Sequence, residues 1–203
     1  MRHVAEIMQL CPVIPVLVID EVDHAVPLAE ALVAGGLGVL EVTLRTPVAL
    51  EAIRAMKQVS GAVVGAGTVL NPEQLDHALA AGSEFIVSPG LTGPLGRAAV
   101  ASGVPFLPGV ATSGEIKRGL DLGLTHFKFF PAMAAGGIPA LQAIGGPFAD
   151  VRFCPTGGIT EATAPDWLAL DQVLCVGGSW IAPRGPVDGE AVTASASRAA
   201  ALR

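Results

Sequence analysis

The chain has 203 residues, which is enough for one well-filled core and too few for two comfortable domains. Hydrophobic residues make up 51% and charged residues 15%, with a mean hydropathy of +0.59, which excludes a disordered chain and suggests that some apolar surface is hidden between subunits. The formal net charge is −6 and there is no basic run, so nucleic acid is not an expected partner.

The termini and the cysteines indicate a soluble cytoplasmic protein with no membrane partner. The N-terminus does not resemble a signal peptide, and the longest uncharged run, Pro131–Ala149, is broken by glycines and prolines. Cys11, Cys154 and Cys175 are odd in number and widely spaced, which favours reduced core thiols over a disulfide framework. A catalytic thiol is the weaker alternative, because no histidine lies near one in the sequence.

Eight apolar strand-like runs recur at near-regular spacing after a short leading helix predicted over residues 2–10. The predicted strands are Val13–Ile19, Val39–Leu44, Ala62–Gly67, Phe85–Ser88, Pro105–Pro108, His126–Phe130, Val151–Thr156 and Gln172–Gly177. They are nearly continuous in apolar residues, as is typical of parallel strands covered on both faces. The segments between them have helical periodicity, for example Leu50, Ile53 and Met56 after the second strand.

Local signals mark the helix ends between these strands. Asn71-Pro72-Glu73-Gln74 reads as a cap followed by a proline in the first turn, and Thr112 with Glu115 forms a capping box. Gly35, Gly82, Gly103 and Gly123 close helical segments just before the next strand.

Eight strand–helix units in this length predict a single α/β domain over residues 1–203 that folds as a compact (β/α)8 TIM barrel. Within it we expect a leading helix at 1–10, the barrel core at 11–182 and a C-terminal region at 183–203 that contains a helix at Ala191–Leu202. The alternative is an open doubly wound sheet. That fold favours a glycine fingerprint after the first strand, whereas Ile19-Asp20-Glu21 stands there.

Lys128 is the most unusual residue of the chain. It lies within THFKFFPA (Thr125–Ala132), a strand of bulky apolar residues, whereas the other two lysines, Lys57 and Lys117, fall on polar helix faces. An ammonium in such a run is costly to bury unless it is paired or gives up its proton. An amine that readily loses its proton is suited to act as a Schiff-base nucleophile.

Glu41 is the expected partner of Lys128. Alternation along Val39–Leu44 puts Glu41, Thr43 and Arg45 on one face, and this face is the barrel interior because Val42 and Leu44 suit the helix layer. A carboxylate and an amine in one enclosed site predict an acid/base group with a nucleophile, and a purely structural buried ion pair is the alternative.

Glycines at the ends of three strands indicate ligand binding. Gly65-Ala66-Gly67-Thr68 would let a ligand approach the backbone and offers a hydroxyl on Thr68. The seventh strand ends in Thr156-Gly157-Gly158, and the eighth ends in Gly177-Gly178-Ser179. Glycines after these two strands are a frequent phosphate-binding arrangement in barrels, so we predict a phosphate or a similar anion there.

We expect no metal site and no cofactor. His3, His24, His77 and His126 share no ligand spacing with one another or with carboxylates. His24 and His77 are expected to be solvated, whereas His126 is expected to be a hydrogen-bonded core histidine one layer deeper than Lys128.

Several stretches in chain order carry a family resemblance. They are Leu40–Thr46 (LEVTLRT), Gly65–Pro72 (GAGTVLNP), Phe127–Ala132 (FKFFPA), Arg152–Ile159 (RFCPTGGI) and Val173–Trp180 (VLCVGGSW). Together they resemble the class I 2-keto-3-deoxy-6-phosphogluconate (KDPG) aldolases and their relatives that cleave 4-hydroxy-2-oxoglutarate (KHG). The resemblance implies a homotrimer of barrels that splits the phosphorylated keto acid into pyruvate and glyceraldehyde 3-phosphate without a metal.

The resemblance also implies roles for particular residues. Lys128 matches the family's Schiff-base lysine and Glu41 its proton-transfer carboxylate. Arg45 and Thr68 match the residues that hold the carboxylate of the pyruvyl group. The family's residues that bind the substrate phosphate match Thr156, Gly157, Gly158, Gly178 and Ser179 of this chain.

Two positions depart from the family pattern. Relatives usually carry glutamate where this chain has Met133, and often lysine where it has Pro139. Losing a cation near the anion end puts the preference for a phosphorylated substrate in question. Neither departure touches Lys128 or Glu41.

A barrel with an anion site leaves two alternatives open: a sugar-phosphate isomerase or epimerase that uses Glu41 as its base, and a non-catalytic protein that binds phosphate esters.

Overall fold

The computed structural model describes residues 3–202. Eight parallel strands form one sheet in the order β7-β6-β5-β4-β3-β2-β1-β8. Their bounds are β1 Val13–Leu17, β2 Val39–Thr43, β3 Val63–Gly67, β4 Ile86–Ser88, β5 Phe106–Val110, β6 His126–Phe129, β7 Arg152–Pro155 and β8 Val176–Gly178. Parallel bridges from Phe153 to Val173 and from Thr156 to Gly177 join the two ends of this sheet, so the predicted (β/α)8 barrel is confirmed.

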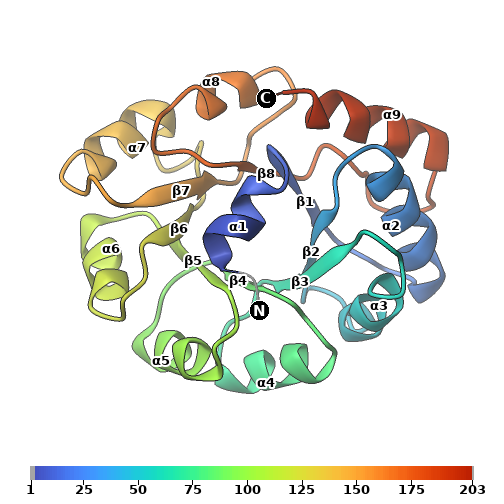
Figure 1. Ribbon diagram of the computed structural model, residues 1–203, viewed down its shortest axis with the longest axis horizontal. Helices are drawn as coiled ribbons and strands as arrows, with labels where there is room; N and C mark the ends of the chain where they lie inside the picture. The colour runs from blue at the N-terminus through green and yellow to red at the C-terminus, as the bar shows by residue number, and fades with distance from the viewer. Residues whose placement is uncertain (1–2, 203) are drawn as a thin grey trace.

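Helices surround this ring of strands (Figure 1). The outer elements are η1 Val22–His24, α2 Ala25–Ala34, α3 Ala49–Met56, α4 Pro72–Ala80, α5 Gly93–Ser102, α6 Ser113–Leu120, α7 Gly137–Gly145, α8 Ala164–Leu168 and α9 Gly189–Ala200. The leading helix α1, Val4–Gln9, crosses over the centre of the ring in this view. Its predicted first residue, residue 2, lies outside the described residues, as do residues 1 and 203.

The side chains of β6 show why an apolar run with one lysine makes a barrel strand. Phe127 and Phe129 point outward: Phe127 lies against Gly119 of α6, and the Phe129 ring is 6.4 Å from the Trp167 ring of α8. Both phenylalanines are fully buried. Lys128 is therefore left on the inner face of the strand, where the alternation places it.

The caps read from the sequence are present. The Asn71 side chain accepts from the N–H of Gln74 at the start of α4, and Thr112 and Glu115 form a reciprocal capping box at α6. The Gln74 side chain differs from the expected capping pattern, because it accepts from the N–H of Leu70 and not from that of Asn71. Gly103 ends α5 in the left-handed region with φ 72°.

Most strands differ from their predicted bounds by one or two residues at an end, and two differences have a clear physical cause. The eighth strand covers Val176–Gly178 whereas Gln172–Gly177 was predicted, because Asp171 and Gln172 form a turn and Val173 makes a single bridge to Phe153. The last helix begins two residues before the predicted Ala191, because the Asp188 side chain caps it by accepting from the Ala191 N–H.

All three cysteines are buried. Among residues 3–202, no helix is long and apolar enough to cross a bilayer.

Candidate active site

The centre of the candidate site is a buried ion pair between β6 and β2. The Lys128 ammonium lies 3.1 Å from Oε1 of Glu41 and 3.5 Å from Oε2, although the two residues are 87 positions apart in the chain. Only 5% of Lys128 and 3% of Glu41 is exposed. The predicted meeting of these side chains inside the barrel is thus confirmed.

The surroundings of Lys128 are tight and mostly apolar. Its Nζ atom lies 5.4 Å from the centre of the Phe130 ring, close enough for a cation–π contact that the sequence alone did not indicate. In the sheet, Lys128 lies next to Gly109 of β5 and Cys154 of β7. The amine is therefore held at a defined place and shielded from bulk water.

Arg45 and Thr68 lie together at the C-terminal ends of β2 and β3. The Arg45 Nε–H donates to the Thr68 hydroxyl at 3.3 Å. The prediction that Arg45 faces the barrel interior is wrong: β2 ends at Thr43, so Arg45 lies beyond the strand and is exposed at the mouth of the barrel. Thr68 has a positive φ of 59°, which is strained for a β-branched residue. Strained backbone positions of this kind cluster at active sites and ligand-binding sites.

The predicted anion-binding segments are neighbours in space. Thr156, which follows β7 and is buried, forms a bridge to Gly177 of β8, so Gly157 and Gly158 approach Gly178 and Ser179. Gly157 and Gly158 have φ values of 106° and 78°. Within the described residues their N–H groups donate to no backbone carbonyl, and successive free N–H groups in such turns form a concave site for anions.

His126 lies at the opposite end of β6 from the barrel mouth. It is half-buried, its Nδ1 atom is 3.0 Å from the Thr125 hydroxyl, and its ring packs edge-on against His3 of the α1 cap at 5.7 Å. Burial lowers the pKa of His126, and the nearby charges of His3 and Arg152 lower it further. The predicted hydrogen bond is present, but the prediction of a core position is wrong, because His126 is only partly buried and lies against His3 near the start of the chain.

Of the two helix histidines, His77 is exposed as predicted, whereas His24 is partly buried. Among residues 3–202, no group of three or more histidine, cysteine or acidic side chains could hold a metal ion.

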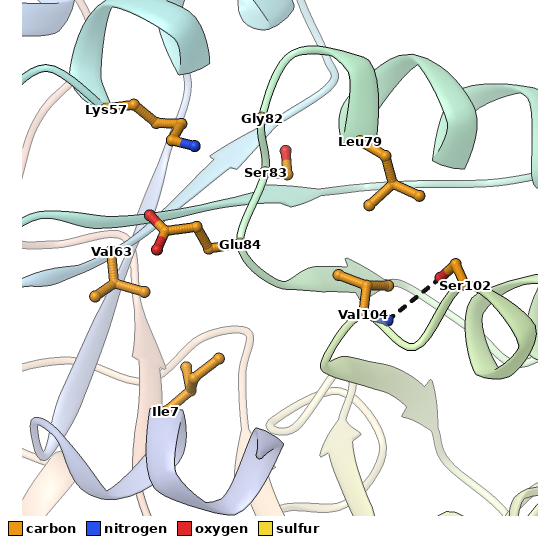
Figure 2. Close-up of a pocket in the computed structure, with 9 residues that line it drawn as sticks. All are labelled: Ile7, Lys57, Val63, Leu79, Gly82, Ser83, Glu84, Ser102 and Val104. Atoms are coloured by element: carbon orange, nitrogen blue, oxygen red, sulfur yellow. Dashed lines mark hydrogen bonds between the residues drawn. The ribbon is translucent and has the colours of Figure 1, made fainter. Parts of the chain in front are cut away.

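A cavity of about 560 Å³ lies at the other end of the barrel (Figure 2). Its walls come from Ile7 of α1, Val63 at the start of β3, and Glu84 and Val104 just before β4 and β5. None of the residues that line this cavity belongs to the Lys128 site.

Comparison with known proteins gives consistent matches over the whole chain. The family model described as "KDPG and KHG aldolase" matches residues 4–195. The 2-dehydro-3-deoxy-phosphogluconate aldolase of Zymomonas mobilis is 59% identical over 203 residues, covering 100% of this chain and 98% of that protein.

Solved structures agree with these matches. The crystal structure of the Zymomonas mobilis ZM4 KDPG aldolase with 3-phosphoglycerate has a TM-score of 0.98 and 59% identity, covering 100% of this chain and 97% of that one. The KDPG aldolase of Legionella pneumophila, with pyruvate captured as a covalent carbinolamine intermediate, has a TM-score of 0.93 and 46% identity, covering 98% and 99%.

Proposed function

The chain belongs to the KDPG and KHG aldolase family, and on that premise we propose that it is a class I aldolase in which Lys128 forms the Schiff base and Glu41 transfers protons. The reaction is the cleavage of KDPG to pyruvate and glyceraldehyde 3-phosphate, a carbon–carbon lyase reaction. The observation that carries the assignment of residues is the buried 3.1 Å contact between the Lys128 amine and the Glu41 carboxylate.

The geometry accounts for the first half of the reaction. Glu41 is placed to take a proton from the Lys128 ammonium, and the free amine then attacks the C2 carbonyl of the keto acid. Glu41 then gives that proton to the hydroxyl of the resulting carbinolamine, which leaves as water and gives an iminium, so that Glu41 is a carboxylate again before the next step. The covalently captured pyruvate in the Legionella pneumophila enzyme is an intermediate of this kind, which supports the same chemistry here.

The iminium then serves as the electron sink for bond cleavage. Glu41, directly or through a water, takes the proton of the C4 hydroxyl while the electrons of the C3–C4 bond flow toward the iminium. Glyceraldehyde 3-phosphate leaves, and an enamine of pyruvate stays on Lys128. Protonation of the enamine at C3 and hydrolysis of the iminium release pyruvate and restore the amine.

The two ends of the substrate are assigned to the two polar regions at the barrel mouth. The Arg45 guanidinium, which donates a hydrogen bond to Thr68, can bind the keto-acid carboxylate through two parallel hydrogen bonds. Thr156, Gly157, Gly158, Gly178 and Ser179 are assigned to the phosphate. The free N–H groups of Gly157 and Gly158 support this assignment, as does the Zymomonas mobilis relative that binds 3-phosphoglycerate.

The family name supports KHG, which yields pyruvate and glyoxylate, as a second substrate. Met133, the position where the family resemblance leads us to expect glutamate, is 48% exposed and lies beside Gly158 of the proposed phosphate site. KDPG carries a phosphate and KHG does not, so comparing the turnover of the two substrates measures how much the phosphate site contributes.

We further propose a homotrimer in the cytoplasm. The family resemblance supports the trimer, and Leu70 and Met133, each about half exposed, are side chains that an assembly could cover. Light scattering of the purified protein tests the trimer, and a monomeric mass would contradict it.

Incubation with pyruvate and borohydride tests the mechanism. Reduction should fix pyruvate irreversibly on Lys128, so mass spectrometry should find the modified peptide around that residue. An isomerase or epimerase that uses Glu41 as a base would stay unmodified. A non-catalytic phosphate-ester binder would show no KDPG cleavage and would bind phosphate esters equally well after Lys128→Ala.

A further inference from the structure

Gly67, the last residue of β3, leaves a space that the Glu41 side chain occupies. In the parallel register of β2 and β3, Glu41 lies opposite Gly65 and Thr43 opposite Gly67, so the Glu41 side chain leans along the barrel toward Gly67. A Cβ atom at residue 67 would lie 2.6 Å from Cγ and 2.8 Å from Cδ of Glu41, and closer still to Oε1. Non-bonded carbon atoms prefer separations of about 3.5–4.0 Å, so any other residue at this position would push the carboxylate away.

This displacement would act on the atoms that react. Oε1, the oxygen that a Cβ at residue 67 would approach most closely, is also the oxygen 3.1 Å from the Lys128 amine. Glu41 is almost fully buried, so it cannot swing into solvent to avoid the collision.

The same construction recurs where β7 meets β8. Thr156 is bridged to Gly177, and a Cβ atom at residue 177 would lie 2.7 Å from Cγ2 and 2.9 Å from Cβ of Thr156, and closer still to its hydroxyl oxygen. Thr156 is 6% exposed and its hydroxyl also contacts the Cys154 carbonyl at 3.4 Å. In both places a polar side chain on one strand lies over a glycine on the next.

We infer that Gly67 and Gly177 are positioning residues, whose missing side chains set the places of the Glu41 carboxylate and the Thr156 hydroxyl. This inference rests on the proposed function for Glu41 and Thr156. It assigns the two glycines different effects, because Glu41 acts in the chemical steps whereas Thr156 is assigned to binding the phosphate. Gly67 therefore governs kcat, and Gly177 governs the KM of the phosphorylated substrate.

The decisive variant is Gly67→Ala, with Gly65→Ala as its matched control. Both substitutions add one methyl group to the inner side of β3, but the three atoms nearest the methyl at residue 65 belong to the Phe85 ring, at 2.5 Å, whereas those nearest the methyl at residue 67 belong to Glu41. Gly67→Ala is expected to lower kcat by about 10- to 100-fold with little change in the KM for KDPG, because small misplacements of reacting groups have effects of this size. Gly65→Ala is expected to lower the melting temperature and to lower kcat much less than Gly67→Ala does.

A shorter side chain at residue 41 distinguishes a displaced carboxylate from general disruption of β3. Glu41→Asp removes one methylene, so the side chain no longer extends as far over residue 67. Glu41→Asp should lower kcat by a smaller factor in the Gly67→Ala variant than in the wild type. Such non-additive effects are expected of residues in contact. If Gly67→Ala does not fold, the double variant should fold again. Failure to restore folding would show that the collision lies elsewhere and would overturn the inference.

Gly177→Ala completes the test. It is expected to raise the KM for KDPG about tenfold while leaving the KM for KHG nearly unchanged, because only KDPG carries the phosphate. Equal changes for the two substrates, or none, would overturn the assignment of Gly177.

Failure of the inference and failure of the proposed function are separable. Wild-type turnover and borohydride trapping test the function. A crystal structure of Gly67→Ala tests the position of the Glu41 carboxylate and needs no activity measurement. The distance from the Lys128 amine to Oε1 of Glu41 should exceed the 3.1 Å of the wild type. An unchanged distance, wild-type kcat, or equal kcat losses in Gly67→Ala and Gly65→Ala would each overturn the role of Gly67.

Discussion

Lys128→Met is expected to destabilise the protein strongly as well as to abolish Schiff-base formation. Methionine is unbranched like lysine, one atom shorter, and carries no charge, so the substitution leaves the Glu41 carboxylate in place without its counter-charge. Glu41 is only 3% exposed, and the hydrogen bonds that its carboxylate accepts within the described residues come from Lys128. Removing one partner of a buried ion pair costs about 3–5 kcal/mol in the free energy of unfolding.

The expected change is large enough to measure by thermal unfolding. For a chain of this size, 1 kcal/mol corresponds to about 2–4 °C, so the melting temperature should fall by roughly 6–20 °C. Urea denaturation at pH 7 gives the free energy directly. Borohydride trapping of pyruvate should be absent in the same preparation.

The double variant Glu41→Leu with Lys128→Met is the control. It removes both charges and replaces them with apolar groups, a change that is often neutral or stabilising by about 1–4 kcal/mol. It should therefore recover most of the lost stability and stay inactive. If Lys128→Met is as stable as the wild type, or if the double variant is as unstable as Lys128→Met, the Glu41 charge is not buried with Lys128 as its only counter-charge, and the reasoning is refuted.

Three further predictions concern the mouth and the base of the barrel. Arg45→Lys keeps the charge but loses the guanidinium fork and the contact with Thr68, so the KM for KDPG should rise about tenfold in steady-state assays, and an unchanged KM would contradict the assignment. Ser179→Ala should weaken KDPG selectively, so equal losses with KDPG and KHG would count against the phosphate assignment. Because burial holds the pKa of His126 below its ordinary value near 6.5, its neutral form stabilises the fold above that pH, and this contribution is lost as the pH falls through the lowered pKa. Urea midpoints of wild type and His126→Gln should therefore converge on acidification from pH 7.5, and a constant difference between them would contradict this view.

The strands and caps could be predicted because their signals are local. An apolar run with a period of two, such as Phe127 to Phe129, has few alternatives to a strand with one inner and one outer face. A cap such as Thr112 with Glu115 is complete within four residues, so no distant contact is needed to form it. The start of the eighth strand was predicted too early for the complementary reason: residues 173–176 are apolar enough for a longer strand, but Asp171 and Gln172 form a turn and Val173 makes only a single bridge to Phe153.

The sequence by itself determined the (β/α)8 barrel and singled out Lys128 and Glu41, because alternation and an isolated charge in an apolar strand are properties of neighbouring residues. Only the tertiary structure decided that their charged groups meet at 3.1 Å and that β7 and β8 are joined through Thr156 and Gly177. The role of Gly67 was likewise hidden: the glycine suggested room for a ligand, whereas the space holds the Glu41 side chain. Which side chain fills a given space depends on strand register and packing between distant segments, and a linear pattern does not contain that information.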